Sequence, residues 1–207
     1  MPNYKLTYFD FDGGRGESAR IAFHMGAIAF DDDRVSFAQF SAMRASTPFN
    51  ALPVLWIDGA PVSQSNAINR YVGKLAGLYP EDTLQALYCD EAMDAVEDLG
   101  LHIGLTIGLK DAALKEAREK LVEGRLPTYV RGLDRLLERG GGQYFADGRM
   151  TVADLKAFVQ IRTFKRGTLD HIPAHLVDEL APALSKHHDR VANDPRVVAY
   201  YAKRAAQ

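Results

Sequence analysis

The sequence predicts a small α/β domain followed by an all-helical domain, and two observations support this fold class. Up to about residue 78, short β-like runs alternate with helical patterns, whereas from residue 83 onward the patterns are long and helical, without a convincing strand. The length of 207 residues suits two small domains and allows a sizeable core to be buried. We therefore expect one domain over residues 1–78 and a second over residues 83–207.

The first half places its elements in the order strand 5–9, helix 15–26 and strand 29–35. Gly26 is a typical C-terminal stop for the helix. Farther along, Asp58-Gly59 lies between two apolar runs, and because both residues tolerate positive φ, the pair predicts a β-hairpin. Ser65 then offers a side-chain cap for a helix that runs to about Leu75. The order β-α-β followed by β-β-α is that of the thioredoxin-like fold.

The second half reads as helices separated by short breaks. Long amphipathic stretches cover residues 83–109 and 112–139, and three glycines at 140–142 end the second stretch. Residues 151–154 (TVAD) have the spacing of a capping box, with Asp in place of the usual Glu, before an apolar run. A last short helix is expected over residues 195–203, with proline in its first turn.

Composition argues against several classes of partner. The formal net charge is −2, so there is no basic field to hold a nucleic acid or an anionic membrane. The longest apolar stretch, residues 99–109, contains His102 and Thr106 and falls short of the ~18 residues that a spanning helix needs. Cys89 is the only cysteine, which excludes a disulfide within the chain, and the N-terminus lacks the shape of a secretion signal. We expect a cytoplasmic protein.

One motif in the first half resembles the sequence signature of a dinucleotide-binding site. Residues 14–19 (GRGESA) match G-x-G-x-x-A after a strand and at a helix start, and residues 31–33 (DDD) lie at roughly the distance of a ribose-binding acid. A dinucleotide fold, however, needs further βαβ units. Here the next strands form a tight hairpin and everything later is helical, so we reject this hypothesis.

Tyr8 and Arg15 form the first candidate site. A tyrosine at the exposed end of a strand can donate its hydroxyl to a substrate anion, and a guanidinium at the start of the next helix favours negative charge there. Taken alone, this pair is more typical of an edge tyrosine and a solvated arginine.

A second candidate combines Pro53 with Gln64 and Ser65. A proline that opens a strand after a loop is compatible with a cis bond that exposes neighbouring backbone groups. A serine at a helix N-terminus is suited to hold a carboxylate. On spacing alone, a plain strand start and an ordinary N-cap are the more frequent readings.

Metal chemistry receives little support. Asp94, Glu97 and Asp98 share one helix face and could receive an ammonium group or a divalent cation, although a solvated acidic face is more typical. The six histidines show no ligand spacing that indicates a metal site. Cys89 lacks the helix-start setting that activates a thiol. We therefore predict no metal.

Five stretches carry a more specific signal through their order and spacing, namely 4–9 (YKLTYF), 13–17 (GGRGE), 47–55 (TPFNALPVL), 64–71 (QSNAINRY) and 148–154 (GRMTVAD). Together they resemble the sigma class of the glutathione transferases over nearly the whole chain. The resemblance implies a thioredoxin-like α/β domain, an all-helical domain, a homodimer and glutathione as co-substrate.

The resemblance also implies roles for individual residues. Tyr8 would donate a hydrogen bond to the glutathione sulfur and hold it as the reactive thiolate, with Arg15 close by. The other implied glutathione contacts are the backbone of Leu52 beside a cis Pro53, Gln64 and Ser65 at the γ-glutamyl carboxylate, Phe40 and Arg44 near the glycine end, and Asp98, from the partner subunit, at the γ-glutamyl ammonium. The implied activity is detoxifying addition of glutathione to small electrophiles, with some reduction of organic hydroperoxides.

Departures from the family pattern concern both the glutathione site and the pocket for the second substrate. The loop at residues 10–14 looks one residue longer than usual, and Ala51 stands where many relatives carry a lysine. Phe40 replaces a tryptophan and so lacks the indole N–H. The implied lining of the electrophile pocket is Phe11, Gly14, Lys156, Gln160 and Thr163. This lining is more polar than an eicosanoid pocket, which argues against prostaglandin isomerase activity.

A non-catalytic member of the family is the alternative, either a ligand carrier or a structural protein like the lens crystallins of this lineage. Retention of Tyr8, Arg15, Gln64 and Ser65 favours catalysis, whereas Ala51 and the longer loop are the features against it. A cysteine-type transferase is rejected because residues 8–18 contain no cysteine.

Overall fold

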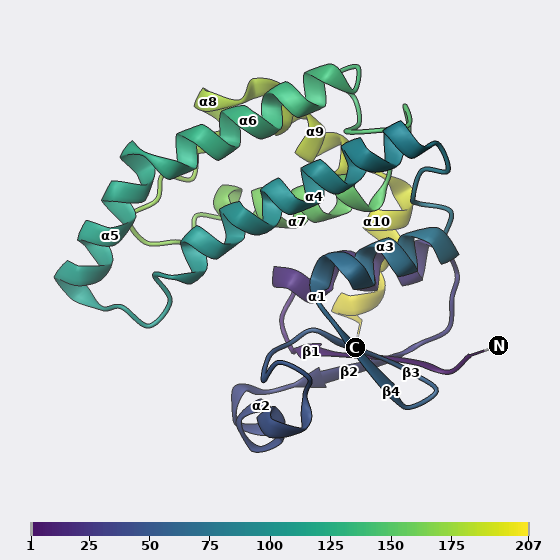
Figure 1. The fold of residues 1–207 in the computed structure, drawn as a ribbon. Helices are drawn as coiled ribbons and strands as arrows, with labels where there is room; N and C mark the ends of the chain where they lie inside the picture. Colours follow the sequence, from purple (N-terminus) through teal and green to yellow (C-terminus); the bar gives the residue numbers. More distant parts are fainter. Residues whose placement is uncertain (1, 207) are drawn as a thin grey trace. The chain divides into compact units, whose positions relative to one another are not determined.

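The computed structural model describes residues 2–206 and divides into two compact units (Figure 1). The first unit comprises the chain up to Tyr79 together with the segment from Pro195 onward, and the second is Pro80–Asp194. The final helix, which the sequence assigns to the helical domain, therefore belongs to the first unit by its contacts.

The first unit is built on a four-stranded sheet with the order β2-β1-β3-β4. Its strands are β1 (Tyr4–Phe9), β2 (Asp31–Val35), β3 (Val54–Ile57) and β4 (Ala60–Ser63). β1 pairs in parallel with β2 and antiparallel with β3, and β3 pairs antiparallel with β4. The predicted hairpin is confirmed, since Asp58 and Gly59 form its turn with φ of 50° and 85°.

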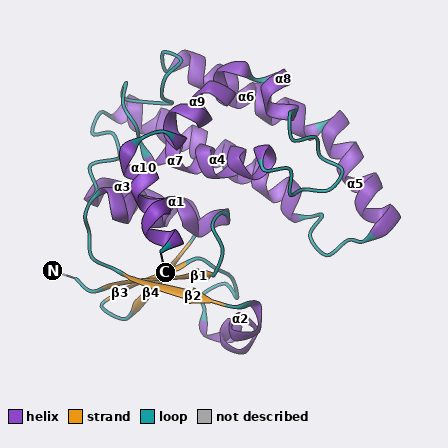
Figure 2. Ribbon diagram, turned by 180° about the vertical axis from the view of Figure 1, so that it is seen from behind, coloured by secondary structure: helices purple, strands orange, loops and turns teal. Residues whose placement is uncertain are grey.

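The helices of the first unit are α1 (Gly14–Met25), α2 (Phe37–Met43), α3 (Ser65–Leu75) and α10 (Pro195–Ala205). Helices α1 and α3 cover one face of the sheet and α2 lies on the other side (Figure 2). The α/β fold class is thus confirmed. Helix α2 was not predicted, although its capping box, Ser36 with Gln39, is legible in the sequence.

Polar contacts explain why α10 belongs with the first unit. The Tyr200 hydroxyl donates to the buried Glu17 carboxylate at 3.1 Å. Arg204 pairs with Asp10 at 2.6 Å and with Asp12 at 3.2 Å, both in the loop after β1. Helix α10 is therefore bound to α1 and to that loop.

The second unit is helical, as predicted, and consists of α4 (Thr83–Gly104), α5 (Asp111–Glu123), α6 (Arg125–Arg139), α7 (Val152–Lys165), α8 (Leu176–Leu180) and α9 (Pro182–Ala192). The stretch 112–139, expected as one helix, is divided at Gly124, whose φ of −125° and ψ of −84° are not helical. Helix α7 is almost entirely buried, and the predicted capping box at Thr151 and Asp154 is present.

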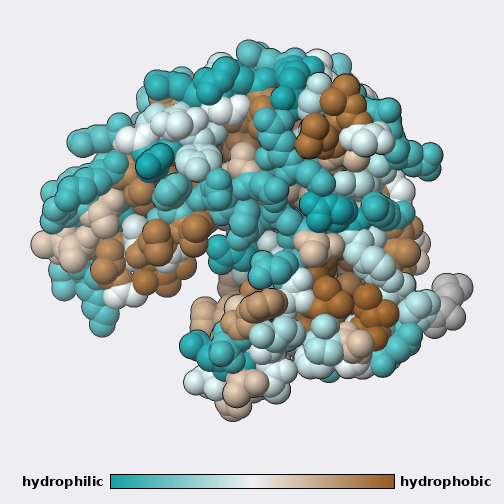
Figure 3. All heavy atoms as spheres, viewed as in Figure 1, coloured by the Kyte–Doolittle hydropathy of each residue, from teal (hydrophilic) through white to brown (hydrophobic). Residues whose placement is uncertain are grey.

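Exposed apolar side chains gather where α4 ends (Figure 3). They are Leu101, Leu105, Ile107 and Leu109. Helix α4 stops at Gly104, whereas the sequence predicts a helical stretch up to residue 109. Within residues 2–206, no helix is both long and apolar enough to cross a membrane. Exposed clusters of this kind are typical of interaction surfaces.

Candidate active site

Tyr8 lies near the end of β1, and the start of α1 approaches its hydroxyl. The ring is 6% exposed, and its Oη accepts a hydrogen bond of 2.9 Å from the backbone N–H of Arg15. A phenolic hydroxyl that accepts through a lone pair keeps a proton that it can donate. The N-terminal end of a helix also carries partial positive charge. This geometry suits a donor to an anion.

Two glycines allow α1 to begin this close to Tyr8. A Cβ at Gly16 would lie only 2.5 Å from Tyr8 Cγ, and one at Gly14 would collide with Tyr8 Oη. Gly14 also has a φ of +67°, which favours glycine. The G-x-G pattern that imitates a nucleotide fingerprint thus permits contact between a helix and a tyrosine. Gly16 is a site residue that the sequence analysis missed, although the same motif contains it.

Replacing Gly16 with alanine is expected to lower kcat/KM by about 10-fold to 10²-fold for the reaction that the sequence resemblance implies, the addition of glutathione to electrophiles. The methyl group would meet Cβ, Cγ and Cδ1 of Tyr8, which have no freedom to move aside, so the ring or the helix must shift. Steady-state kinetics would measure the loss. Gly104→Ala is the matched control, because a Cβ there meets nothing within 4 Å. Equal activity in the two variants would contradict the positioning role.

A buried arginine packs against the Tyr8 ring and binds the backbone at the end of β1. Arg20 is fully buried, with its guanidinium carbon 5.6 Å from the centroid of the Tyr8 ring, and it donates to the carbonyls of Tyr8 and Phe9 at 3.5 and 3.3 Å. It pairs with Asp32 at 2.7 Å and with Glu17 at 3.5 Å. Burial raises the pKa of Glu17, and the positive charge of Arg20 opposes this shift.

Arg20 and Glu17 were not identified from the sequence. A sequence signal was available, because charged residues at i and i+3 on the otherwise apolar face of a helix are unusual unless they are paired. Their contacts order the end of β1 and hence the position of Tyr8.

The loop after β1 places an aromatic ring beside Tyr8. Phe11 is 41% exposed and meets the Tyr8 ring edge-on with 5.7 Å between centroids. The loop carboxylates flanking it, Asp10 and Asp12, are held by Arg204 from α10. The loop therefore forms an ordered wall next to the tyrosine.

The segment before α3 differs in one detail from expectation. Ser65 is the first residue of α3, and the N-cap position is taken by Gln64, whose side chain makes no capping hydrogen bond. The prediction that Ser65 caps the helix is therefore wrong. The reason is that Gln64 has a φ of 76°, which turns the chain into the helix one residue earlier. Ser65 is buried at this helix start, and the Leu52–Pro53 bond is cis.

Phe40 and Arg44 lie next to each other. The Arg44 guanidinium carbon is 5.1 Å from the centroid of the Phe40 ring, a cation–π arrangement. Phe40 is buried in α2, whereas Arg44 begins the exposed 3-10 turn that follows. Ala51 is exposed in the next loop.

The remaining predicted site residues belong to the second unit. Lys156 is 6% exposed, and its ammonium pairs with Glu97 at 2.6 Å, so its charge is balanced within the second unit. The Thr163 hydroxyl donates back to the carbonyl of Val159 at 3.1 Å. Gln160, also in α7, has its Oε1 near Gly100 of α4, 3.2 Å from where a Cβ would stand.

The acidic cluster of α4 is divided between different partners. Glu97 faces Lys156, whereas Asp98 accepts a 3.2 Å hydrogen bond from the Tyr129 hydroxyl. No group of three or more side chains suited to bind a metal occurs in the part of the chain that the structure describes. Burial raises the pKa of the Cys89 thiol to about 12, so this cysteine is an inert core residue.

Family models and known proteins match this chain over nearly its whole length. The model of the glutathione S-transferase N-terminal domain matches residues 4–74, and that of the C-terminal domain matches residues 98–204. Glutathione S-transferase 3 of Caenorhabditis elegans is 31% identical over 210 residues, covering 99% of this chain and 98% of the relative. S-crystallin SL11 of Nototodarus sloanii is 28% identical, with 99% and 98% covered.

A solved structure agrees with the sequence relatives. The prostaglandin synthase D of Nilaparvata lugens superimposes with a TM-score of 0.86 at 30% identity, covering 98% of both chains. Both family domains match in the expected order, and the relatives match over nearly their full length, so the family of this chain is clear. The chain belongs to the glutathione S-transferase family, whose co-substrate is glutathione.

Proposed function

We propose that this protein joins the thiolate of glutathione to small electrophiles, with Tyr8 as the residue that stabilises the thiolate. The observation that supports this most is the hydrogen bond from the Arg15 N–H to Tyr8 Oη. A hydroxyl that accepts from a backbone N–H is polarised, which makes it a stronger donor to a sulfur anion. Donation to the thiolate favours the charged form of the sulfur.

The chemical step needs no further reactant. The thiol proton leaves to solvent, and the thiolate lone pair attacks the electrophilic carbon. With an aryl chloride, the S–C bond forms, the C–Cl bond breaks and chloride leaves with the bonding electrons. Tyr8 keeps its proton and only hydrogen-bonds the sulfur.

The rest of glutathione would be held along the first unit. Ser65, at the N-terminus of the 11-residue helix α3, would bind the γ-glutamyl carboxylate together with Gln64. The backbone of Leu52 would pair with the cysteinyl part. Phe40 and Arg44 would face the glycine end, where the guanidinium offers the positive charge that Ala51 lacks.

We further propose a homodimer in which Asp98 of one protomer faces the γ-glutamyl ammonium bound by its partner. The exposure of this carboxylate and its contact with the Tyr129 hydroxyl are compatible with that role. Sedimentation velocity would test the dimer. On the family basis, we also propose a cytoplasmic location and reduction of organic hydroperoxides as a side activity.

The substrate class is small and fairly polar. With Lys156 in the proposed pocket lining, its ion pair with Glu97 would add an ionic contact where an eicosanoid would need apolar surface, so prostaglandin isomerisation is not proposed. A non-catalytic, crystallin-like role is the second candidate, because a lens crystallin is among the relatives. The Tyr8 geometry favours the enzyme.

Two measurements on the wild-type protein, of conjugation rate and of glutathione ionisation, distinguish between these two functions. We expect it to accelerate conjugation of glutathione with 1-chloro-2,4-dinitrobenzene and, at neutral pH, to bind glutathione with the ultraviolet absorbance of a thiolate. Bound glutathione that stays a thiol, with no acceleration, would establish a carrier instead. Failure to bind glutathione would reject both roles of the site.

A further inference from the structure

Helix α10 is bound to the loop that carries the aromatic ring beside Tyr8. Arg204 Nη2 lies 2.6 Å from Asp10 Oδ1, and its Nε lies 3.2 Å from Asp12 Oδ1. These two carboxylates flank Phe11, whose ring meets the Tyr8 ring edge-on with 5.7 Å between centroids. A single side chain of α10 is thus paired with both neighbours of the residue that packs against the candidate catalytic tyrosine.

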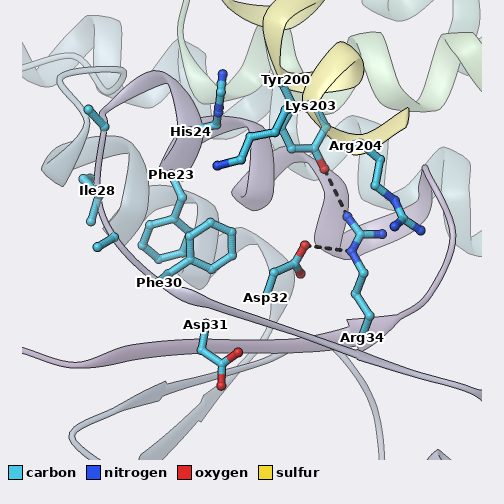
Figure 4. A pocket seen from close by; sticks show the side chains of 12 residues that line it. Phe23, His24, Ile28, Phe30, Asp31, Asp32, Arg34, Tyr200, Lys203 and Arg204 are labelled. Atoms are coloured by element: carbon cyan, nitrogen blue, oxygen red, sulfur yellow. Dashed lines mark hydrogen bonds and ion pairs between the residues drawn. The ribbon is translucent and has the colours of Figure 1, made fainter. Parts of the chain in front are cut away.

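A second guanidinium borders the same carboxylates at greater distance. Arg34 Nη1 lies 3.6 and 3.8 Å from the Oδ1 atoms of the two loop carboxylates. Its Nε is bound to Asp32 at 2.7 Å, and its Nη2 donates to the Tyr200 hydroxyl at 3.5 Å, with Arg204 beside it (Figure 4). Arg34 is therefore held mainly by Asp32, so Arg204 makes the shorter contacts with the loop.

Charged groups of three elements surround this loop. Helix α10 contributes Arg204, β2 contributes Arg34, and α1 contributes Glu17 together with Arg20, which pair at 3.5 Å. Arg20 and Arg34 also share the carboxylate of Asp32, each at 2.7 Å. Arg204, in contrast, has both of its ion pairs with the loop. Among these cations, Arg204 is therefore the one whose charge serves the loop alone.

The loop carboxylates lie close along the chain to the atoms proposed to hold the sulfur. Asp10 follows Tyr8 by two residues. Asp12 precedes Arg15 by three residues, and the Arg15 N–H donates to Tyr8 Oη at 2.9 Å. Burial is the main cause that raises the pKa of Glu17 in α1, and the negative charge of Asp12 adds to it. An unbalanced carboxylate in this loop would in the same way oppose ionisation of a bound thiol.

We propose that Arg204 is a positioning residue for glutathione conjugation, which holds the loop after β1 against Tyr8 and cancels the negative charge of the two loop carboxylates beside the thiolate. The inference rests on the proposed function of Tyr8, because it concerns the same sulfur. Arg204 acts through Asp10 and Asp12 and forms no bond to the reactants. Its removal should therefore change the ionisation of the bound thiol, and not only the stability of the first unit.

Arg204→Gln in the full-length protein tests this role. The absorbance of the bound glutathione thiolate, measured against pH, should show the pKa of the thiol raised by about 0.5, which is about a 3-fold loss of thiolate below that pKa. The rate constant kcat/KM with 1-chloro-2,4-dinitrobenzene should fall about 3-fold in the same pH range and approach the wild-type value at higher pH. Arg204→Glu adds a third carboxylate and should lower kcat/KM about 10-fold, whereas Arg204→Lys keeps the charge and should stay within about 2-fold of wild type.

Lys203→Gln is the matched control. It removes the same charge from the same turn of α10, and Lys203 forms no ion pair with a carboxylate of residues 2–206, so the pH profile should stay that of wild type. Hydrogen exchange over residues 10–15 should be faster in Arg204→Gln than in Lys203→Gln, because only the former releases the loop. The triple variant Asp10→Asn/Asp12→Asn/Arg204→Gln removes the loop carboxylates as well, and should return the thiol pKa to the wild-type value or below.

The proposal would be overturned by equal pH profiles, or by equal hydrogen exchange, in Arg204→Gln and Lys203→Gln. A loss of the same size at every pH, with the thiol pKa unchanged, would also overturn it, because that result indicates a role in packing alone. The proposed function of Tyr8 fails in a different way. Wild-type protein that binds glutathione only as a thiol would reject both roles, whereas an active wild type with an unchanged Arg204→Gln would reject only that of Arg204.

Discussion

Replacing Tyr8 with phenylalanine is expected to lower kcat for glutathione conjugation by about 10²-fold or more, with little change in KM for glutathione. Only the hydroxyl is removed, and the ring keeps its packing against Gly16 and Phe11. The contacts that would bind the peptide part of glutathione lie elsewhere, around residues 52–65, so binding should survive. Steady-state kinetics with 1-chloro-2,4-dinitrobenzene would measure both constants.

The pH dependence gives a second readout of the same substitution. The reactive species is the deprotonated thiol, so kcat/KM rises with pH until the bound thiol is fully ionised. A donor to the sulfur moves that rise to lower pH. Without the Tyr8 hydroxyl, the rise should move up toward the value of a free thiol, about 8.5. Saturation at the same pH in both proteins would contradict the thiolate role.

Tyr71→Phe is the control for loss of a hydroxyl. Its Oη lies 3.2 Å from that of Tyr4, at the end of β1 opposite Tyr8, and no role in glutathione binding is proposed for it. Its conjugation rate should equal that of wild type. If Tyr71→Phe and Tyr8→Phe lost activity to the same degree, the loss would reflect general packing of the first unit.

Local signals were sufficient for most of the fold. Alternation of apolar residues and the Asp58-Gly59 turn predicted the hairpin, and the spacing of Thr151 and Asp154 predicted the start of α7. Each depends on a few neighbouring residues whose conformational preferences agree with the tertiary structure. The two-part fold class follows from these local features.

Tertiary contacts account for the errors. Nothing local in residues 195–203 indicates that α10 binds the first unit, because the partner of Tyr200 lies 183 residues earlier and those of Arg204 lie 192 and 194 residues earlier. Ser65 looks like an N-cap, but the left-handed Gln64 shifts the helix start by one residue. Gly124 divides a helix that amphipathic periodicity alone would have continued.

The candidate site was only partly accessible to sequence reasoning. Tyr8 and Arg15 stood out as residue types at the end of a strand and the start of a helix, yet the pair is commonplace in isolation. The structure brings the backbone N–H of Arg15 to the tyrosine hydroxyl. This contact depends on the two glycines around Arg15, because a Cβ at either would collide with Tyr8. The sequence does not show this, since it does not give the position of the Tyr8 ring.

The second unit depends on one buried carboxylate. Asp154 is fully buried and accepts hydrogen bonds from the Thr151 N–H and hydroxyl at 2.7 and 2.8 Å, from the Phe145 N–H at 3.1 Å and from His187 at 2.8 Å. A carboxylate only accepts, so the proton of this pair is on His187 Nε2. Asp154 therefore joins α7 to the loop before it and to α9.

Replacing Asp154 with alanine is expected to lower the free energy of unfolding by about 3–5 kcal/mol, because it leaves four buried donors without their acceptor. Urea denaturation would show this as a lower midpoint.

Asp82→Ala is the matched control. It removes the N-cap of α4, which accepts hydrogen bonds from the N–H groups of Leu84 and Gln85 at an exposed site, and it should lower the free energy of unfolding by about 1 kcal/mol. Losses of equal size would mean that Asp154 acts only as a helix cap. A larger loss in Asp154→Ala would show that its contacts with Phe145 and His187, beyond the helix end, hold the second unit together.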